Sequence, residues 1–181
     1  MCGIAGKVWF DAERPADVEA VRAMTAALAH RGPDGEGLHV HGAAAFGHRR
    51  LAIVDLSERG AQPMLDREAG LVLVANGEIY NHRALRAELA HDGQGFRSDC
   101  DVEVILPLYK RWFASEGAHF VDRLDGMFAF ALWDGAARRL ILARDRTGQK
   151  PLVYAHTDAG LSFASELPAL AHDPDLDRTP D

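Results

Sequence analysis

Several features that define other protein classes are scarce or missing in this sequence. The 181-residue chain has two cysteines, Cys2 and Cys100, so it has no disulfide framework, and none of its nine histidines pairs with a cysteine at zinc-ligand spacing. No apolar run is long enough to span a bilayer, and the amino terminus lacks the basic and apolar segments of a signal peptide. We therefore expect a cytoplasmic protein with no membrane anchor and no metal site.

Positive charge is also in deficit. Lysine and arginine total 20 residues against 27 aspartates and glutamates, which gives a net charge of -7. Clustered Lys and Arg supply the affinity for phosphate backbones and anionic lipids, so this balance argues against a nucleic-acid or membrane partner. What is present is an ordinary globular composition, with 48% hydrophobic and 26% charged residues, at a length that suits one domain.

The apolar pattern predicts helices in the first two thirds of the chain and consecutive strands in the last third. Helices are expected over 15–30, over 81–90 with Asn81 as N-cap, and over 101–113, where Pro107 should bend the helix or delay its start. Strands are expected at 4–10, twice within 39–53, and at 71–75, 127–133, 140–143, 152–156 and 161–164. Because turn sequences rather than helices separate the last strands, we predict an α+β fold with antiparallel sheets.

Cys2 is the most informative residue. Its small side chain permits removal of Met1, which would leave a thiol and a free α-amine on one residue. An α-amine has a reference pKa of about 7.7–8.0 and a thiol one of about 8.5, so the amine can accept the thiol proton near neutral pH. Taken alone, Cys2 fits a small buried residue of a first strand equally well.

Asn76 and Gly77 are candidate oxyanion donors. Attack of a thiolate on a carboxamide creates a negative oxygen, and an Asn side-chain amide together with the next backbone N–H could converge on it. Asn-Gly is also the most favoured two-residue hairpin turn. Here a helical pattern follows instead of a matching return strand, so the catalytic interpretation is favoured.

An amino-acid substrate would need a cation for its α-carboxylate and anions for its α-ammonium. Arg50 precedes the apolar run 51–54 and could present its guanidinium at the end of a strand. Glu78 and Asp101 are candidate anions. Each of these residues, taken singly, is more often a solvated surface charge or an acid at a helix start.

Motifs along nearly the whole chain resemble one family. They are MCGIAG at 1–6, HRGPDG at 30–35, HRRLAIVD at 48–55, NGEIYN at 76–81, SDCDVEVIL at 98–106, LDGMFAF at 124–130, ARDRTG at 143–148, KPL at 150–152 and FASEL at 163–167. In this order they resemble the glutaminase domain of class II glutamine amidotransferases, specifically the asparagine synthetase type. Several independent motifs in sequence make the resemblance specific.

The resemblance implies an N-terminal-nucleophile hydrolase fold, a four-layer αββα sandwich of two antiparallel sheets between helices. It implies that Cys2 attacks L-glutamine to form a glutamyl thioester and release ammonia, with Asn76 and Gly77 as the oxyanion hole. The loop 30–34 would shape the pocket near the thiol.

The same resemblance implies how glutamine would be held. Arg50 would bind the α-carboxylate, and the main chain of Leu51, Ile53 and Val54 would line the site. Glu78 and Asp101 would bind the α-ammonium group.

The sequence departs from the family pattern in places. We align Cys100-Asp101-Val102-Glu103 with its Ser-Asp-Thr-Glu segment because the residues that follow fix the register, although Ser98-Asp99 offers a rival frame in which Asp99 would bind the ammonium group.

The Ser-Gly-Gly-x-Asp-Ser phosphate loop of asparagine synthetases does not occur in these 181 residues. We therefore expect no cofactor in this chain, with ATP and Mg bound only by a synthetase domain outside it. Residues 2–172 would form the glutaminase domain, and 173–181 would begin a linker.

The expected partner is a C-terminal synthetase domain or a separate ammonia-accepting subunit. The sequence neither predicts nor excludes a homodimer. The predicted function is ammonia supply for asparagine synthesis. The alternative is a stand-alone or regulatory amidotransferase-like module that serves another amidation. A catalytically silent module is disfavoured because Cys2 and Asn76 are both present.

Overall fold

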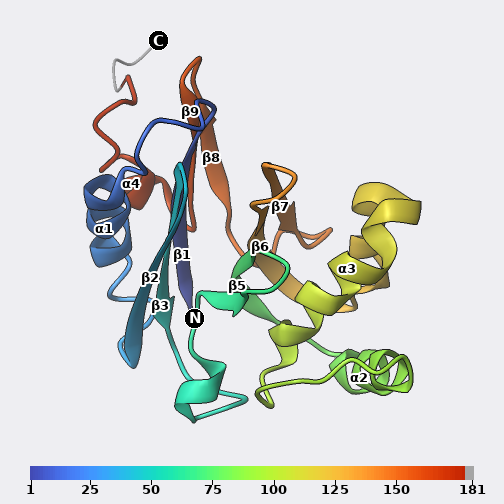
Figure 1. The fold of residues 1–181 in the computed structure, drawn as a ribbon. Coiled ribbons are helices and arrows are strands. Elements are labelled where there is room, and N and C mark those ends of the chain that lie inside the picture. Colours follow the sequence, from blue (N-terminus) through green and yellow to red (C-terminus); the bar gives the residue numbers. More distant parts are fainter. Residues whose placement is uncertain (178–181) are drawn as a thin grey trace. The chain divides into compact units, whose positions relative to one another are not determined.

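The computed structural model describes residues 1–177, which fall into two compact units. The first unit contains residues 1–51 and the residues from 151 onward, and the second contains residues 52–150. Each unit has its own antiparallel sheet and its own helices (Figure 1). The predicted α+β class with two antiparallel sheets is confirmed.

The first unit is built on a five-stranded sheet in the order β2-β3-β1-β9-β8. Its strands are β1 (Gly3–Trp9), β2 (Gly35–His41), β3 (Ala44–Arg50), β8 (Val153–His156) and β9 (Gly160–Ala164). Every residue of β1 is buried, because it is the central strand and has a helical layer over one face. This burial explains why the residues of the strand, apart from Lys7, are apolar or small.

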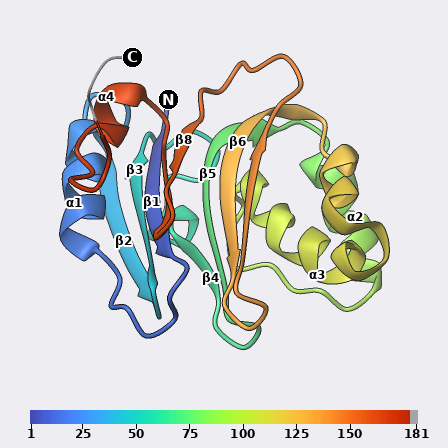
Figure 2. The same ribbon diagram turned by 90° about the horizontal axis from the view of Figure 1, so that it is seen from above.

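Helices α1 (Val18–Ala27) and α4 (Leu167–Leu170) lie on the same side of that sheet (Figure 2). Val21, Met24 and Leu28 of the α1 region pack with Ala5 and Ala45 of the sheet in one buried cluster. The Asp17 side chain caps α1 by accepting a hydrogen bond from the backbone N–H of Ala20 at 3.1 Å.

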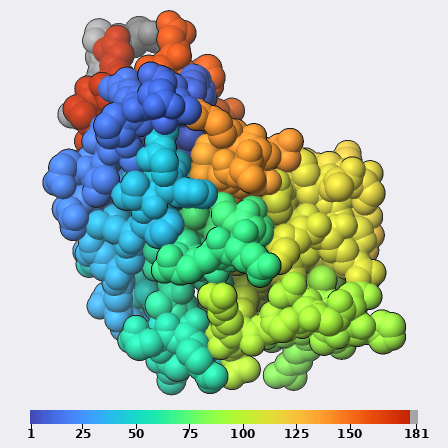
Figure 3. Space-filling view, viewed as in Figure 1, coloured from blue at the N-terminus to red at the C-terminus, as the bar shows by residue number. Residues whose placement is uncertain are grey.

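The segment after α4 is held to the start of the chain by Lys7. The Lys7 Nζ donates to Asp17 at 2.9 Å, to Asp173 at 2.6 Å and to Asp175 at 2.5 Å. In Figure 3 the red surface of the last described residues adjoins the blue surface of the first part of the chain. The first residues of the predicted linker are thus well anchored; residues 178–181 lie outside the described residues, and the domain boundary stays a prediction.

The second unit is built on a four-stranded sheet in the order β4-β5-β6-β7. Its strands are β4 (Met64–Asp66), β5 (Leu71–Ile79), β6 (Gly126–Asp134) and β7 (Arg139–Arg144). Helices α2 (His82–His91) and α3 (Ile105–Glu116) cover one face (Figures 1 and 2). The core between them includes Leu73, Leu108 and Phe130, all fully buried.

The α-helix that contains Pro107 begins four residues later than the predicted start at residue 101. Residues Asp101–Val104 form the 3₁₀ helix η2, and the α-helix starts at Ile105, so Pro107 lies in its first turn. A proline is tolerated there because the first N–H groups of a helix have no intrahelical acceptor. The predicted delay of the helix start is confirmed.

The predicted side-chain cap of α2 by Asn81 is not formed. Asn81 occupies the N-cap position, but its Nδ2 donates to the Arg123 carbonyl at 2.9 Å and its Oδ1 accepts from the Asp125 N–H at 3.1 Å. The amide therefore links the start of the helix to the loop before β6.

Among the helices of residues 1–177, none combines the length and the apolar character that a membrane span requires.

Candidate active site

Cys2 lies directly before β1 and is half-buried. Its Sγ lies 3.4 Å from the backbone nitrogen of Leu51 and 3.6 Å from the Leu51 carbonyl oxygen. The antiparallel register that pairs Gly3 with Arg49 brings these two segments together. A backbone N–H directed at the sulfur stabilises its thiolate form, the form that acts as a nucleophile.

Arg31, in the loop that follows α1, contacts the main chain of Cys2. Its side chain is 7% exposed, its Nε donates to the Cys2 carbonyl at 2.9 Å, and its Nη1 donates to Glu166 at 2.5 Å. The loop 30–34 thus lies beside the cysteine. Neither Arg31 nor Glu166 was singled out from the sequence, because their contacts join segments 29 and 135 residues apart.

Arg50 is the last residue of β3 and lies at the end of a strand, as expected, but the apolar run 51–54 that follows it is not part of the strand. Its carbonyl accepts the Asp34 N–H at 2.9 Å, and it pairs with Gly35 in β2. Gly32 packs so closely here that a Cβ on it would lie 2.5 Å from the Arg50 nitrogen. The main chain around Arg50 is therefore fixed by the loop that also carries Arg31.

Asn76 and Gly77 lie inside β5, opposite Ala129 and Phe128 of β6. The hairpin-turn interpretation of Asn-Gly is wrong, and so is the expectation that the strand stops at residue 75. Asn76 is 2% exposed, and its Nδ2 has no hydrogen-bond partner among the described residues. A buried amide donor without an acceptor costs about 1–3 kcal/mol, so it marks a position where a ligand oxygen could be received.

Asp101 is tied to the strand that carries Asn76. It is 4% exposed, and its Oδ2 accepts the Ile79 N–H at 2.6 Å, one residue after the half-buried Glu78. Asp99 is exposed, and it is its backbone N–H that makes a contact, to Asp55 at 2.9 Å. This placement supports Asp101 over Asp99 as the residue near the predicted oxyanion donors.

Asp55 joins the loop after β3 to the segment before η2. Its Oδ1 accepts from the Ser57 N–H at 2.8 Å and from the Ser57 hydroxyl at 2.6 Å, while its Oδ2 accepts from Asp99. The hydrogen bonds from Ser57 and Asp99 lower the pKa of the Asp55 carboxyl to about 2. The neighbouring Ile53 and Val54 are 60% and 46% exposed, so their side chains contribute little to the core.

The predicted site residues divide between the two units. Cys2, Arg50 and Leu51 belong to the first unit, and the others belong to the second: Ile53, Val54, Asn76, Gly77, Glu78 and Asp101. Within the first unit the structure brings Cys2 and Leu51 together, and within the second it connects Asp101 to the strand of Asn76 and Glu78.

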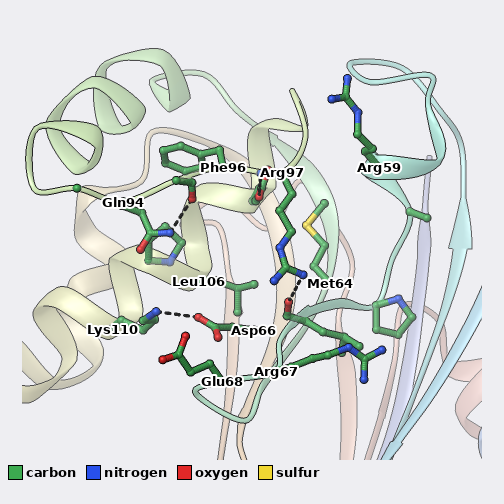
Figure 4. A pocket seen from close by; sticks show the side chains of 17 residues that line it. Arg59, Met64, Asp66, Arg67, Glu68, Gln94, Phe96, Arg97, Leu106 and Lys110 are labelled. Carbon is green, nitrogen blue, oxygen red and sulfur yellow. Dashed lines mark hydrogen bonds and ion pairs between the residues drawn. The ribbon is translucent and has the colours of Figure 1, made fainter.

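A cavity of about 660 Å³ in the second unit contains none of these residues (Figure 4). The loop that precedes β4, the loop after α2 and the start of α3 line it, with Arg97 reaching the Leu65 carbonyl and Lys110 paired with Asp66 at 2.8 Å. The lining of this cavity therefore does not identify it as the predicted glutamine site.

Comparison with known proteins gives a consistent family assignment. The family model described as a glutamine amidotransferase domain matches residues 1–181. Glutamine-hydrolyzing asparagine synthetase 2 of Bacillus subtilis is 39% identical over 180 residues, which cover 98% of this chain and 23% of that protein. Asparagine synthetase B of Escherichia coli is 44% identical over 144 residues, or 79% of this chain and 25% of that protein. The chain thus spans about a quarter of the length of these curated relatives.

Solved structures share the fold. The glutamine phosphoribosylpyrophosphate amidotransferase of B. subtilis matches with a TM-score of 0.77 at 23% identity, over 94% of this chain and 43% of that one. A structure described as the allosteric regulatory enzyme of purine biosynthesis matches with a TM-score of 0.78 at 25% identity, over the same shares of the two chains.

Proposed function

The chain belongs to the glutamine amidotransferase domain family, related to the N-terminal part of asparagine synthetases, and from this premise we propose that it hydrolyses L-glutamine to glutamate and ammonia. The observation that carries the proposal is the fixed nucleophile. Cys2 is held through its sulfur by the main chain of Leu51 and through its carbonyl by Arg31. Neither contact involves the residue's own nitrogen, which becomes an α-amine and a candidate base once Met1 has been removed.

The reaction would use the two functional groups of Cys2 in turn. The α-amine takes the thiol proton, and the thiolate attacks the carboxamide carbon of glutamine. The tetrahedral intermediate collapses as the C–N bond breaks, and the protonated amine returns its proton to the leaving nitrogen, which departs as ammonia. The amine then takes a proton from water, which hydrolyses the glutamyl thioester and regenerates the thiol.

The oxyanion of the tetrahedral intermediate would be bound by the Asn76 side-chain amide and the Gly77 backbone N–H. The buried Nδ2 of Asn76 supports this role, because it has no acceptor among the described residues. A donor that is already desolvated and oriented gains an acceptor only when the negative oxygen forms, which stabilises the transition state selectively.

The substrate would be held at its amino-acid end. Arg50 would bind the α-carboxylate with its planar guanidinium, the main chain of Leu51, Ile53 and Val54 would line the site, and Glu78 and Asp101 would bind the α-ammonium group. Arg50 and Leu51 belong to the first unit, and Ile53, Val54, Glu78 and Asp101 belong to the second.

We further propose that the ammonia serves asparagine synthesis. The supporting observation is the likeness to proteins named as glutamine-hydrolyzing asparagine synthetases, of which this chain spans about a quarter. The ATP-dependent synthesis of asparagine, which uses ATP and Mg, would take place in a synthetase domain or a separate subunit. Transfer of the ammonia to a different acceptor is the alternative.

The substitution Cys2→Ala tests the proposal, because it removes the sulfur and little buried area. Ammonia release from glutamine should fall to background while the circular dichroism spectrum and thermal unfolding midpoint stay close to those of the parent protein. Full glutaminase activity in the variant would defeat the proposed function. Cys100→Ala is the matched control, and it should leave the activity intact.

A further inference from the structure

In the first unit, hydrogen bonds and two short main-chain segments form a closed ring that includes Cys2. Cys2 accepts from Arg31, and Arg31 donates to Glu166. The neighbouring Ser165 is in turn bonded to Ile4, with its N–H donating to the Ile4 carbonyl at 2.8 Å and its hydroxyl accepting the Ile4 N–H at 2.9 Å. Since Ile4 is two residues from Cys2, the ring returns to the residue from which it began.

Cys2 depends on such contacts because it would become the first residue of the mature chain. A terminal residue has no preceding peptide to fix it and is poorly ordered unless side-chain or main-chain contacts tie it down. The bond from Arg31 Nε fixes the orientation of the peptide plane that follows Cys2. That plane governs whether the sulfur stays at 3.4 Å from the Leu51 nitrogen.

Arg31 depends on Glu166 for its own position. Its guanidinium is almost completely buried, and a buried cation without a counter-charge is strongly unfavourable. Glu166 supplies that charge, because the hydrogen bond from Arg31 lowers the pKa of its carboxyl and keeps it ionised at neutral pH. The exposed His30 also contacts Glu166, through Nε2 at 3.1 Å.

We propose that Glu166 is a positioning residue for the nucleophile: it holds the Arg31 guanidinium against the Cys2 carbonyl and thereby fixes the sulfur and the α-amine for attack. It touches neither the substrate nor the reacting atoms. The inference rests on the proposed glutaminase function, which it deepens by adding a residue 164 positions from the nucleophile. Loss of Glu166 frees the guanidinium to turn toward solvent and releases the Cys2 peptide plane.

The test compares Glu166→Gln and Glu166→Ala with the parent protein after removal of Met1. We expect kcat for glutamine hydrolysis to fall about 10- to 100-fold in Glu166→Ala and by less in Glu166→Gln, which keeps one acceptor oxygen. KM should stay within about twofold in both variants, because the proposed glutamine contacts are left in place. A general loss of folded protein would instead lower the measured rates in proportion to the fraction unfolded.

Glu116→Gln is the matched control. Glu116 pairs with Arg123 in the second unit at the same distance of 2.5 Å and with similar exposure, 31% against 27% for Glu166. The control should leave kcat and KM unchanged, whatever its effect on the thermal unfolding midpoint. A second readout, the rate of Cys2 alkylation by iodoacetamide followed by peptide mass spectrometry, needs no glutamine.

The outcomes separate the two proposals. A parent protein that hydrolyses glutamine, together with Glu166 variants whose kcat is unchanged, overturns the positioning role and leaves the glutaminase function standing. A parent protein that releases no ammonia overturns the function, and the alkylation rates then decide the positioning role alone. We expect slower Cys2 alkylation in both Glu166 variants and not in Glu116→Gln; equal rates in all proteins overturn the inference.

Discussion

Replacement of Asn76 by alanine should separate activity from stability. The Asn76 Nδ2 is buried and has no hydrogen-bond partner among the described residues, so the resting protein gains nothing from that donor. If it serves the oxyanion, its loss removes a contact made only in the transition state. We expect kcat to fall about 100- to 1,000-fold, which corresponds to about 3–4 kcal/mol of lost transition-state stabilisation.

The expected change in folding stability is small or opposite in sign. Burial of an unsatisfied amide costs about 1–3 kcal/mol, and its removal returns that amount. The lost packing of the amide group costs about 1 kcal/mol, by analogy with a buried methylene. The free energy of unfolding should therefore stay level or rise by up to about 2 kcal/mol.

The assay pairs steady-state glutaminase kinetics with urea unfolding on the same preparations. Asn76→Asp is the companion variant, because it keeps the shape but places a negative charge where the oxyanion forms, and it should be less active than Asn76→Ala. A kcat within about twofold of the parent value would refute the oxyanion role. A loss of stability greater than about 2 kcal/mol with a parallel loss of activity would show that Asn76 supports the fold instead.

Three further substitutions test the carboxylate contact, the packing of β5 and the acid stability of the second unit. Arg50→Lys should raise KM for glutamine about tenfold with little change in kcat, because an ammonium cannot reproduce two-pronged carboxylate binding, and an unchanged KM would remove Arg50 from the site. Gly77→Ala should lower the free energy of unfolding by about 1–3 kcal/mol in urea titrations, since its Cβ would lie 2.7 Å from the Phe128 Cα; a stability equal to that of the parent would contradict this packing. Asp145 is partly desolvated, but hydrogen bonds from three backbone N–H groups and a hydroxyl outweigh that effect and lower its carboxyl pKa to about 2, below the value in the unfolded chain. Its contribution to stability is thus present above about pH 4 and is lost as the pH falls toward 2. In urea unfolding measured between about pH 4 and pH 2, Asp145→Asn should reduce the loss of stability with falling pH. An unchanged loss would show that other groups cause the acid sensitivity.

Local patterns were sufficient to predict the fold class. The strand predicted at 4–10 is β1, and the runs near 127–133, 140–143, 152–156 and 161–164 are the last four strands. Apolar spacing carries this information because burial against a sheet or helix face imposes its period on the sequence. The three-residue strand β4 was not predicted, since its apolar run is too short to show a period.

Predictions failed where distant contacts overrode local preference. Asn-Gly favours a tight turn, yet pairing with β6 extends β5 through both residues to Ile79. Asn81 is a good N-cap residue, yet its amide bonds the loop before β6 instead. In both cases the tertiary partner lies more than 40 residues away.

The sequence located the candidate nucleophile but not the residues that hold it. Cys2, Asn76 and Arg50 could be proposed because their chemistry is distinctive and motifs surround them. Arg31 contacts Cys2 and Glu166 contacts Arg31, across 29 and 135 residues of sequence. No local period or spacing reveals such contacts. The motifs at 30–35 and 163–167 contain both residues, but only the structure shows what they touch.

The state of the amino terminus provides the most direct test of the central claim, that the α-amine of Cys2 is the base. Protein with Met1 removed and protein that retains Met1 should be separated, identified by intact mass, and assayed side by side for ammonia release from glutamine. Activity is expected only in the form that begins with Cys2, since the retained methionine converts the amine to an amide. Equal activity in both forms would contradict it.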